Sequence, residues 1–429
     1  MMTGRWYARV AFMVALLLCA GAASAGIIRV KSAVAPANVK LQEGVAALLK
    51  GDVTAADQAF NSALELDPKS AGAHLGLAQV ADIRGNQERA TSHYAKAREL
   101  APSNADVEAL WGAYLNSRKR YAEAEAALKK AVGFEPTAVD PHVFLGDLYL
   151  ASLDRPKEAA AEYRTATKLE PANAGAHYGL GLSLQASGDL AGAERSLSEA
   201  GRLDPKNPLV FMALGRLRAR QGQYAQALEA LDTAVKLHPA FAAAHIERGR
   251  VLAASGDDAR ALEAFGAALK ANPKLADPQI EIGMLYQRQK RWADAERAYR
   301  AAVDLDPKSA VAYNNAAWMW AERKTNTATA VEWARKAVGL APDVPEFMGT
   351  LGWAYRAAGD LPKALEQLKK ASAKKPRDAG IWYRTGVVLS EMGRRQEAIA
   401  SLKKALELNP AFPDAGDARR LLNELGAGR

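Results

Sequence analysis

Apolar and polar residues along the chain follow a helical period, and this pattern itself recurs about every 34 residues. Residues 351–376, LGWAYRAAGDLPKALEQLKKASAKKP, show one unit: two short amphipathic stretches, a glycine between them and a proline at the end. Because proline cannot continue a helix, such prolines mark the end of each second helix. They predict eleven helix pairs, which end near Pro68, Pro102, Pro136, Pro171, Pro205, Pro239, Pro273, Pro307, Pro342, Pro376 and Pro410.

Small residues occupy fixed positions in this repeat. When each terminal proline is numbered 32, position 8 is glycine or alanine and positions 20 and 27 are alanine in all eleven units. Position 24 is large in ten units; the ninth has Ala334 there, with Trp333 beside it. Helices approach closely only where side chains are small. We therefore expect position 8 to face position 20, and position 27 to receive the next pair.

Glycine fills position 15 in seven units, where a left-handed residue would end the first helix. Two single-residue insertions lie near this point, one around Arg155 and Pro156 and the other around Lys324 to Asn326. Since loops tolerate changes in length, both insertions are expected between the two helices of their units.

These small, large and proline positions, in phase over eleven units, closely resemble the tetratricopeptide repeat family across residues 37–412. The resemblance implies an all-α fold, a right-handed α-α superhelix (solenoid) of eleven helix-turn-helix repeats with a concave groove. One pair cannot bury its apolar face alone, so stacked pairs form the core. After the last repeat, a capping helix is expected, with Leu421, Leu422 and Leu425 covering that repeat and its charged residues facing water.

The expected organisation is a signal segment at 1–25, a leader at 26–36, eleven repeats over 37–412, and a capping helix and tail at 413–429. The first repeat carries Lys40 and Glu43 where large apolar residues are usual, as a solvated terminal repeat should. The repeats are 37–70, 71–104, 105–138, 139–173, 174–207, 208–241, 242–275, 276–309, 310–344, 345–378 and 379–412.

The first 25 residues are typical of a secretory signal peptide. Arg5 and Arg9 form a positive segment before an apolar run that is short for a membrane span, and Ala23-Ser24-Ala25 forms a small-x-small cleavage pattern. The mature chain is therefore expected to begin at Gly26 and to lie in the periplasm or outside the cell. An uncleaved membrane anchor is the alternative.

Cys19, the only cysteine, lies inside this segment. It leaves open an outer-membrane lipoprotein, although Leu18 is larger than the residue usual before a lipidated cysteine. Cleavage after Ala25 would leave a chain without a thiol, which suits an oxidising compartment.

The formal net charge is +9. Behind a secretion signal, this charge favours acidic peptides, acidic polysaccharides or lipid head groups over nucleic acid as partners. A solvated basic surface is the plainer interpretation. The basic run KKASAKKPR, residues 369–377, is expected on an outer ridge of its second helix, with an anionic surface contact as the sharper alternative.

No stretch is left over for a catalytic domain, and no known arrangement of catalytic or metal-binding residues appears. Four of the six histidines share position 4 of their repeats, which indicates packing rather than metal binding: His74, His142, His177 and His245. There is no His-Glu-x-x-His motif, and the glycine-rich GLGLSLQASG is helical rather than a phosphate loop. We expect no enzyme activity, no cofactor and no metal.

On the first helix of each repeat, positions 4, 7, 8 and 11 hold packing residues, and positions 2, 5, 9, 12 and 13 form a sector about 140° away. The family resemblance places this second sector on the concave face. Arginine and aromatic residues anchor many binding sites, methionine adds adaptable apolar surface, and arginine grips carboxylates bidentately. The candidate groove residues are Met212, Arg216, Arg220, Arg250, Met284, Arg288, Trp318, Trp353 and Tyr383.

Asparagine offers a weaker signal. The Lys/Asn carboxylate clamp of the chaperone-binding members of the family is not found here. Asn314 and Asn315, in YNNAAW, resemble a groove asparagine of the family, but only one repeat has them.

The leading interpretation is a non-enzymatic scaffold of the bacterial cell envelope that holds a protein or peptide segment, with acidic groups, in its groove. It would assist assembly of a secretion, exopolysaccharide or pilus system. One alternative is direct binding of an acidic polysaccharide, with Trp318, Trp353 and Tyr383 stacking on sugar rings. Another is an accessory arm for a glycosyltransferase on a separate chain.

Overall fold

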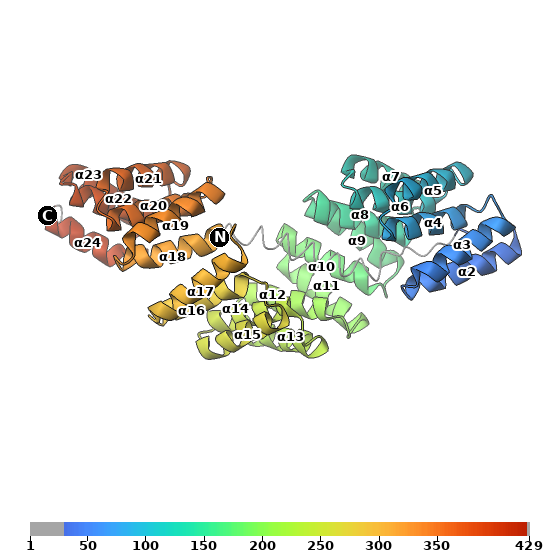
Figure 1. The fold of residues 1–429 in the computed structure, drawn as a ribbon, viewed down its shortest axis with the longest axis horizontal. Coiled ribbons are helices and arrows are strands. Elements are labelled where there is room, and N and C mark those ends of the chain that lie inside the picture. Colours follow the sequence, from blue (N-terminus) through green and yellow to red (C-terminus); the bar gives the residue numbers. More distant parts are fainter. Residues whose placement is uncertain (1–29, 427–429) are drawn as a thin grey trace. The chain divides into compact units, whose positions relative to one another are not determined.

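The computed structural model describes residues 30–426. Within this range the chain forms eleven consecutive pairs of helices and one further helix, and no strand (Figure 1). The two helices of each pair pack along each other, and within each of the two compact units described below each pair packs on the next. The all-α solenoid of helix-turn-helix repeats with a C-terminal capping helix is confirmed. The expected signal segment, 1–25, lies outside the described residues.

The chain divides into two compact units, each described by itself: an N-terminal unit that ends at Pro239 and a C-terminal unit that starts at Ala240. The N-terminal unit contains α2 (Ala35–Leu49), α3 (Val53–Leu66), α4 (Ala71–Ile83), α5 (Gln87–Leu100), α6 (Ala105–Ser117), α7 (Tyr121–Phe134), α8 (Val139–Asp147), η1 (Leu148–Ser152), α9 (Pro156–Leu169), α10 (Ala174–Ser187), α11 (Leu190–Leu203), α12 (Pro208–Arg220) and α13 (Tyr224–Leu237).

The C-terminal unit contains five pairs and the final helix. They are α14 (Ala242–Ala254), α15 (Asp258–Ala271), α16 (Asp277–Arg288), α17 (Trp292–Leu305), α18 (Ala310–Glu322), α19 (Thr327–Leu340), α20 (Pro345–Ala357), α21 (Leu361–Lys374), α22 (Ala379–Glu391), α23 (Arg395–Leu408) and α24 (Ala415–Glu424).

Glycine at position 8 is the point of closest approach within a pair. A Cβ built on Gly215 would lie 2.5 Å from Leu231 Cγ and 3.0 Å from the carbonyl oxygen of Ala227. On Gly249 it would lie 2.6 Å from the Phe265 ring. Position 8 therefore does approach position 20 as expected, but it approaches the backbone carbonyl of that residue. The side chain that packs against position 8 comes from position 24.

In the ninth repeat, tryptophan side chains fill the space between the two helices. Ala317 and Ala334 stand at positions 8 and 24, and both are fully buried. Trp320, on the same helix as Ala317, is also fully buried, and its ring meets Trp333 edge-on at 5.0 Å. Trp333 therefore covers this repeat together with Trp320, which the sequence pattern did not single out.

A left-handed residue ends the first helix in all eleven repeats, not only in the seven with glycine. Four other residues adopt this conformation, with φ between 52° and 62°: Lys119, Asp154, Lys290 and Lys324. Polar side chains then begin many helices; those of Asp52, Ser70 and Asn104 each accept a hydrogen bond from the amide three residues later.

The two insertions are accommodated differently. The first is absorbed in the helix itself, because Leu148–Ser152 form a π-helical turn in which the amide of Leu153 bonds to the carbonyl of Leu148 at 3.1 Å. The expectation that this insertion lies wholly in the loop was wrong. The second lies in the loop as expected, where Asn326 adds a second left-handed residue after Lys324.

The described part of the leader packs against the first repeat. The α2 helix begins at Ala35, two residues before the expected repeat. Ser32 is 9% exposed, its hydroxyl bonds to Asp67, and its carbonyl accepts a hydrogen bond from Asn38 at 2.8 Å. These contacts fasten the leader to the first repeat.

The final helix has the expected amphipathic arrangement. Leu422 is buried, and Leu421 and Leu425 are partly buried against the last repeat. Arg419, Arg420 and Glu424 are exposed. Among the described residues, no helix is long and apolar enough to cross a membrane.

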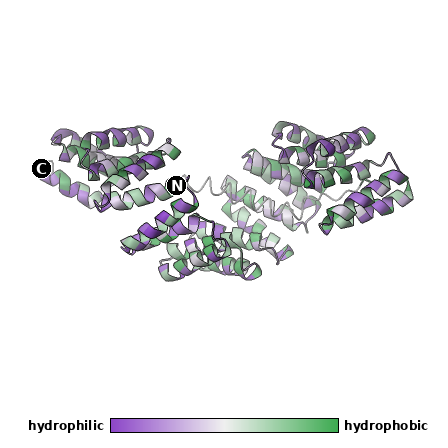
Figure 2. Ribbon diagram, viewed as in Figure 1, coloured by the Kyte–Doolittle hydropathy of each residue, from purple (hydrophilic) through white to green (hydrophobic). Residues whose placement is uncertain are grey.

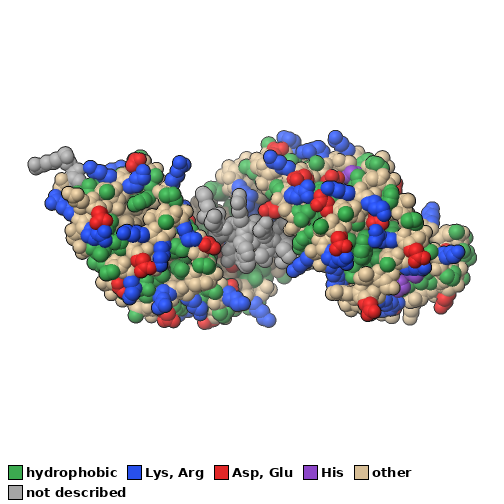
Figure 3. All heavy atoms as spheres, turned by 90° about the horizontal axis from the view of Figure 1, so that it is seen from above, with side chains coloured by type: hydrophobic (Ala, Val, Ile, Leu, Met, Phe, Trp, Pro, Cys, Tyr) green, Lys and Arg blue, Asp and Glu red, His purple; other side chains and the backbone are tan. Residues whose placement is uncertain are grey.

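Hydrophilic and hydrophobic residues alternate around the helices of both units (Figure 2). Basic and acidic side chains lie next to each other over the visible surface (Figure 3). In the basic run 369–377, too, lysines lie next to acidic residues: Lys374 pairs with Asp343 at 2.8 Å and Lys375 with Glu346 at 2.7 Å. Exposed pairs of this kind add little stability, and the solvated ridge stays a prediction.

Two glycines of the seventh repeat test the packing. Gly249→Ala should destabilise the protein by about 1–3 kcal/mol, because its Cβ would overlap Phe265. Gly266→Ala on α15 should stabilise by about 0.5–1 kcal/mol, because no atom lies within 4 Å of its Cβ and alanine favours helix. Urea unfolding measures both. Equal effects of the two substitutions would contradict the packing account.

Candidate functional site

A cavity of about 510 Å³ lies on the C-terminal unit, where the first helices of the seventh, eighth and ninth repeats meet. Most of its wall comes from α16, with α14, α17 and α18 contributing the rest. The lining residues are Ala253, Glu281, Met284, Leu285, Gln287, Arg288, Trp292, Tyr299, Asn315 and Trp318.

The wall is apolar, with a few polar groups. Met284 is 49% exposed, more than the other exposed large apolar residues described in the C-terminal unit, Leu305 and Leu340. The Tyr299 hydroxyl donates to Gln287 Oε1 at 2.9 Å, and burial raises the pKa of Tyr299, so that hydroxyl stays protonated. Asn315 Oδ1 accepts a hydrogen bond from Asn314, whereas the Asn315 amide nitrogen has no partner among the described residues. The Gln287 amide nitrogen likewise has no partner among the described residues, so the cavity offers apolar contact and two free amide donors.

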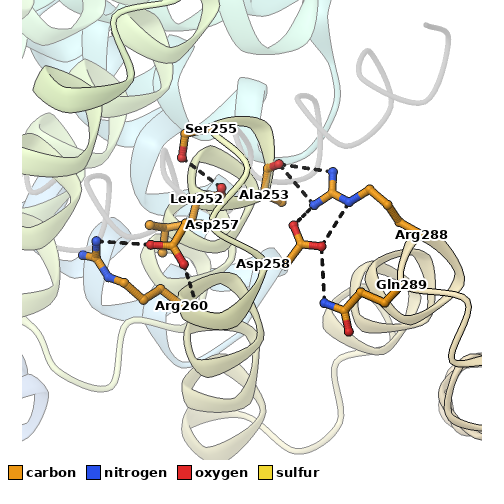
Figure 4. Close-up of polar contacts among 8 residues, drawn as sticks. All are labelled: Leu252, Ala253, Ser255, Asp257, Asp258, Arg260, Arg288 and Gln289. Carbon is orange, nitrogen blue, oxygen red and sulfur yellow. Dashed lines mark hydrogen bonds and ion pairs between the residues drawn. The ribbon is translucent and has the colours of Figure 1, made fainter.

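The arginines of this region are already paired within the chain. Arg288 reaches back from α16 to the α14–α15 turn, where it bonds to Asp258 and to the carbonyl of Ala253 at 3.3 Å (Figure 4). Arg250 Nε donates to Glu281 Oε1 at 2.7 Å, and Nη1 to Glu247 at 3.4 Å. These two side chains link neighbouring repeats, and they do not form the row of free cations expected from the sequence.

The aromatic candidates are also engaged. Trp353 is 7% exposed, its indole donates to Glu322 at 2.8 Å, and the Arg356 guanidinium lies 4.1 Å from the ring centre. Trp318 stacks on Trp353 with ring centres 6.2 Å apart. Trp353 is therefore a packing residue, and stacking of this ring on a sugar is contradicted by its burial.

Tyr383 lies further along the unit. Its ring packs against Phe412, with ring centres 5.7 Å apart, in the cluster under the final helix. Burial, with Asp414 and Asp417 nearby, raises the pKa of its hydroxyl. Tyr383 does not line the cavity.

The remaining candidates, Met212, Arg216 and Arg220, belong to the N-terminal unit. Met212 is 3% exposed, so it is a core residue and cannot contact a ligand. Arg216 is half-buried with its Nε unpartnered among the described residues, and Arg220 is exposed. Of the nine candidates, the structure brings three together around the cavity: Met284, Arg288 and Trp318.

The helical-wheel argument failed at one position. Position 5 was assigned to the groove, but Ile280, at that position of the eighth repeat, lies in the core cluster with Ala316 of α18. Position 6 lines the cavity instead, through Glu281 and Asn315. The asparagine in YNNAAW was the one signal in the sequence that pointed to this position.

The histidines at position 4 anchor the start of a first helix to the turn before it. His142 Nε2 bonds to the carbonyl of Pro136 at 3.0 Å, and His177 Nε2 to that of Pro171 at 3.1 Å. The second nitrogen of His142 bonds to Glu162 at 2.6 Å. The described residues contain no group of three side chains that could hold a metal ion.

The recurring geometry agrees with comparisons of the sequence. A family model described as "Tetratricopeptide repeat" matches residues 41–105, 212–276, 280–345 and 350–414, and a second model of the same description matches 151–217. The first model alone covers more than half of the chain. The chain belongs to the tetratricopeptide repeat family, and its fold is that of a protein–protein interaction scaffold.

Individual relatives are more distant. The chain is 36% identical over 91 residues to "Type IV pilus assembly protein PilF" of Pseudomonas aeruginosa. The matched segment covers 21% of this chain and 36% of that protein, so the chain spans about a third of the relative's length. Among solved structures, it is similar to the "APC/C hetero-tetramer Cut9-Hcn1" (14% identity, TM-score 0.49, 92% and 96% of the two chains). It is also similar to yeast Tom70 (15% identity, TM-score 0.47, 91% and 96%).

The position-4 histidines should titrate differently from one another. The hydrogen bond to Glu162 raises the pKa of His142 above 6.5, whereas burial and the neighbouring His93 lower the pKa of His74 to about 4. The contribution of His142 to stability is therefore present below about pH 6.5 and is lost as the pH rises through its raised pKa. The contribution of His74 is lost as the pH falls from 6.5 towards 4.

NMR titration of the imidazole signals measures both values, and Glu162→Gln should lower that of His142 alone. Two pKa values near 6.5 would contradict the hydrogen bond between His142 and Glu162 and the burial of His74 beside His93.

Proposed function

We propose that this chain is a non-enzymatic scaffold of the bacterial cell envelope whose C-terminal unit holds a segment of a partner polypeptide. The observation that carries the proposal is the cavity beside Met284 and Trp318. It has mostly apolar walls and a free amide donor on Asn315, and its two charged residues, Glu281 and Arg288, are already paired with Arg250 and Asp258. Pockets of this size suit an apolar side chain, with polar groups fixing its orientation.

Each part of the wall has a separate role in this proposal. Met284 gives a flexible apolar surface that adapts to different side chains. Trp318 supplies a large, rigid contact area, as tryptophan does at the centre of many interfaces. The amide of Asn315 can donate to a backbone carbonyl of an extended segment, which would fix the register of the bound chain.

The arginine side chains contribute less to ligand binding in this proposal than the sequence suggested. Arg250 and Arg288 are held by acidic residues of neighbouring repeats, so an acidic polymer would have to displace those pairs. This competition, together with the burial of Trp353, favours a polypeptide over an acidic polysaccharide as the ligand.

The envelope location is supported by the signal-like residues 1–25. The similarity to a protein named for type IV pilus assembly supports a role in building an envelope machine, such as a pilus or secretion system. A row of stacked helix pairs exposes a continuous surface that can hold an extended segment of a partner subunit.

Photo-crosslinking in the native cells tests the proposal. A photoreactive residue at Met284 should crosslink to a polypeptide, and the product should be sensitive to protease. The matched control is Arg297 on α17, which is more exposed, with 77% of its side chain accessible, but lies away from the cavity. Trp318→Ala should weaken the crosslink at Met284 roughly tenfold or more.

Equal labelling at Met284 and Arg297, or a protease-resistant product, would contradict the cavity as a peptide site. The chain recovered from the same cells should begin at Gly26 and come from the envelope fraction. A chain that still begins at Met1, recovered from the cytosol, would overturn the export part of the proposal alone.

A further inference from the structure

Arg384, on α22, is a partly buried arginine that lies against an aromatic ring. Its guanidinium carbon lies 4.4 Å from the centre of the Trp318 ring. Two glycines make room for it: a Cβ on Gly349 would lie 3.2 Å from Nη1, and one on Gly380 would lie 3.8 Å from Nη2. The guanidinium therefore occupies a slot between an aromatic face and glycine backbone, and the side chain is only partly exposed.

No hydrogen bond or ion pair joins Arg384 to any described residue, although guanidinium has five N–H donors. By contrast, Arg250, Arg288 and Arg356 each bind a carboxylate, on Glu281, Asp258 and Glu391 respectively. First helices of this unit thus carry three arginines that are paired with a carboxylate and one, Arg384, whose N–H donors have no such partner.

The acidic groups nearest to Arg384 are committed elsewhere or too distant. Asp378 pairs with Lys375 at 2.8 Å and caps α22 through the amide of Ile381. Glu322 accepts the indole N–H of Trp353. Asp414 acts on Arg384 only from beyond ion-pair distance, and burial raises the pKa of its carboxyl. Burial likewise lowers the pKa of Arg384, which is the direction expected for a cation whose charge is incompletely compensated.

A half-buried cation without a partner is unfavourable, and a bound anion would remove that cost. The planar fork of guanidinium matches a carboxylate, which it can hold through two parallel hydrogen bonds. A singly charged carboxylate also suits the site better than a doubly charged phosphate, because Glu322 and Asp414 add negative potential nearby.

We propose that Arg384 is an anion subsite that binds a carboxylate of the polypeptide held in the neighbouring cavity. The inference rests on the proposed function, because the two sites share one residue. Trp318 lines the cavity and also stacks on Arg384. The ligand segment would thus combine an apolar residue with a carboxylate at a fixed spacing. That carboxylate is either an acidic side chain or the C-terminus of the segment.

Selection of random short peptides, displayed with free C-termini, against the full mature chain tests this inference. Wild type should enrich peptides in which a carboxylate follows or precedes an apolar residue at constant spacing. Arg384→Gln should keep the apolar preference and lose the carboxylate. The matched control is Arg356→Gln, whose arginine is paired with Glu391 and which should retain the carboxylate preference.

For a selected peptide, replacing the carboxylate by an amide should weaken binding to wild type roughly tenfold to a hundredfold and leave binding to Arg384→Gln unchanged. An effect of amidating the C-terminus assigns the chain terminus as the source, and an effect of replacing Glu by Gln in the peptide assigns a side chain. Arg384→Gln should change the melting temperature little, since it removes an unpaired cation together with its stacking contact on Trp318.

Enriched peptides without a carboxylate, or the same preference in Arg384→Gln, would overturn the subsite and leave the cavity in place. A lowered melting temperature in Arg384→Gln would assign Arg384 a structural role instead. If wild type enriches no peptides at all, the proposed function itself is contradicted.

Discussion

The close approach of two helices at position 8 of each repeat is the contact on which the rest of the structure depends. Glycine there lets the first helix touch the backbone of the second, and a buried side chain from position 24 closes the gap. Because this contact uses one side of the first helix, its other side is left for the neighbouring repeat and for solvent. The surface available for binding is therefore a by-product of how each pair packs.

The ninth repeat shows how a change in this packing brings new chemistry. With alanine at both positions 8 and 24, the space is filled by Trp320 and covered by Trp333. On the same helix α18, Trp318 and Asn315 face the cavity, and Trp318 also meets Arg384. The repeat with the least regular core thus adds a tryptophan and an asparagine to a cavity whose wall comes mostly from the eighth repeat.

The fold could be predicted from the sequence because small, large and proline residues keep one phase over eleven units, and close packing admits few other arrangements. The π-helical turn at Leu148–Ser152 could not be predicted from the sequence. A repeat that is one residue longer shows that an insertion exists, but not whether a helix or a loop accommodates it. The candidate site was predicted only in part. A helical wheel could not show that position 5 is covered by the neighbouring repeat, as for Ile280, or that Arg250 and Arg288 would reach acidic residues of adjacent repeats.

A double-mutant cycle between Gly249 and Phe265 tests the central contact most directly. If the Cβ of Gly249→Ala collides with the Phe265 ring, then Phe265→Leu should relieve part of the damage. The free energies of unfolding of the two single variants and the double variant would then be non-additive, with a favourable coupling of about 1 kcal/mol. Additive effects within error would show that the two positions do not touch, and would contradict the packing on which both the fold and the site depend.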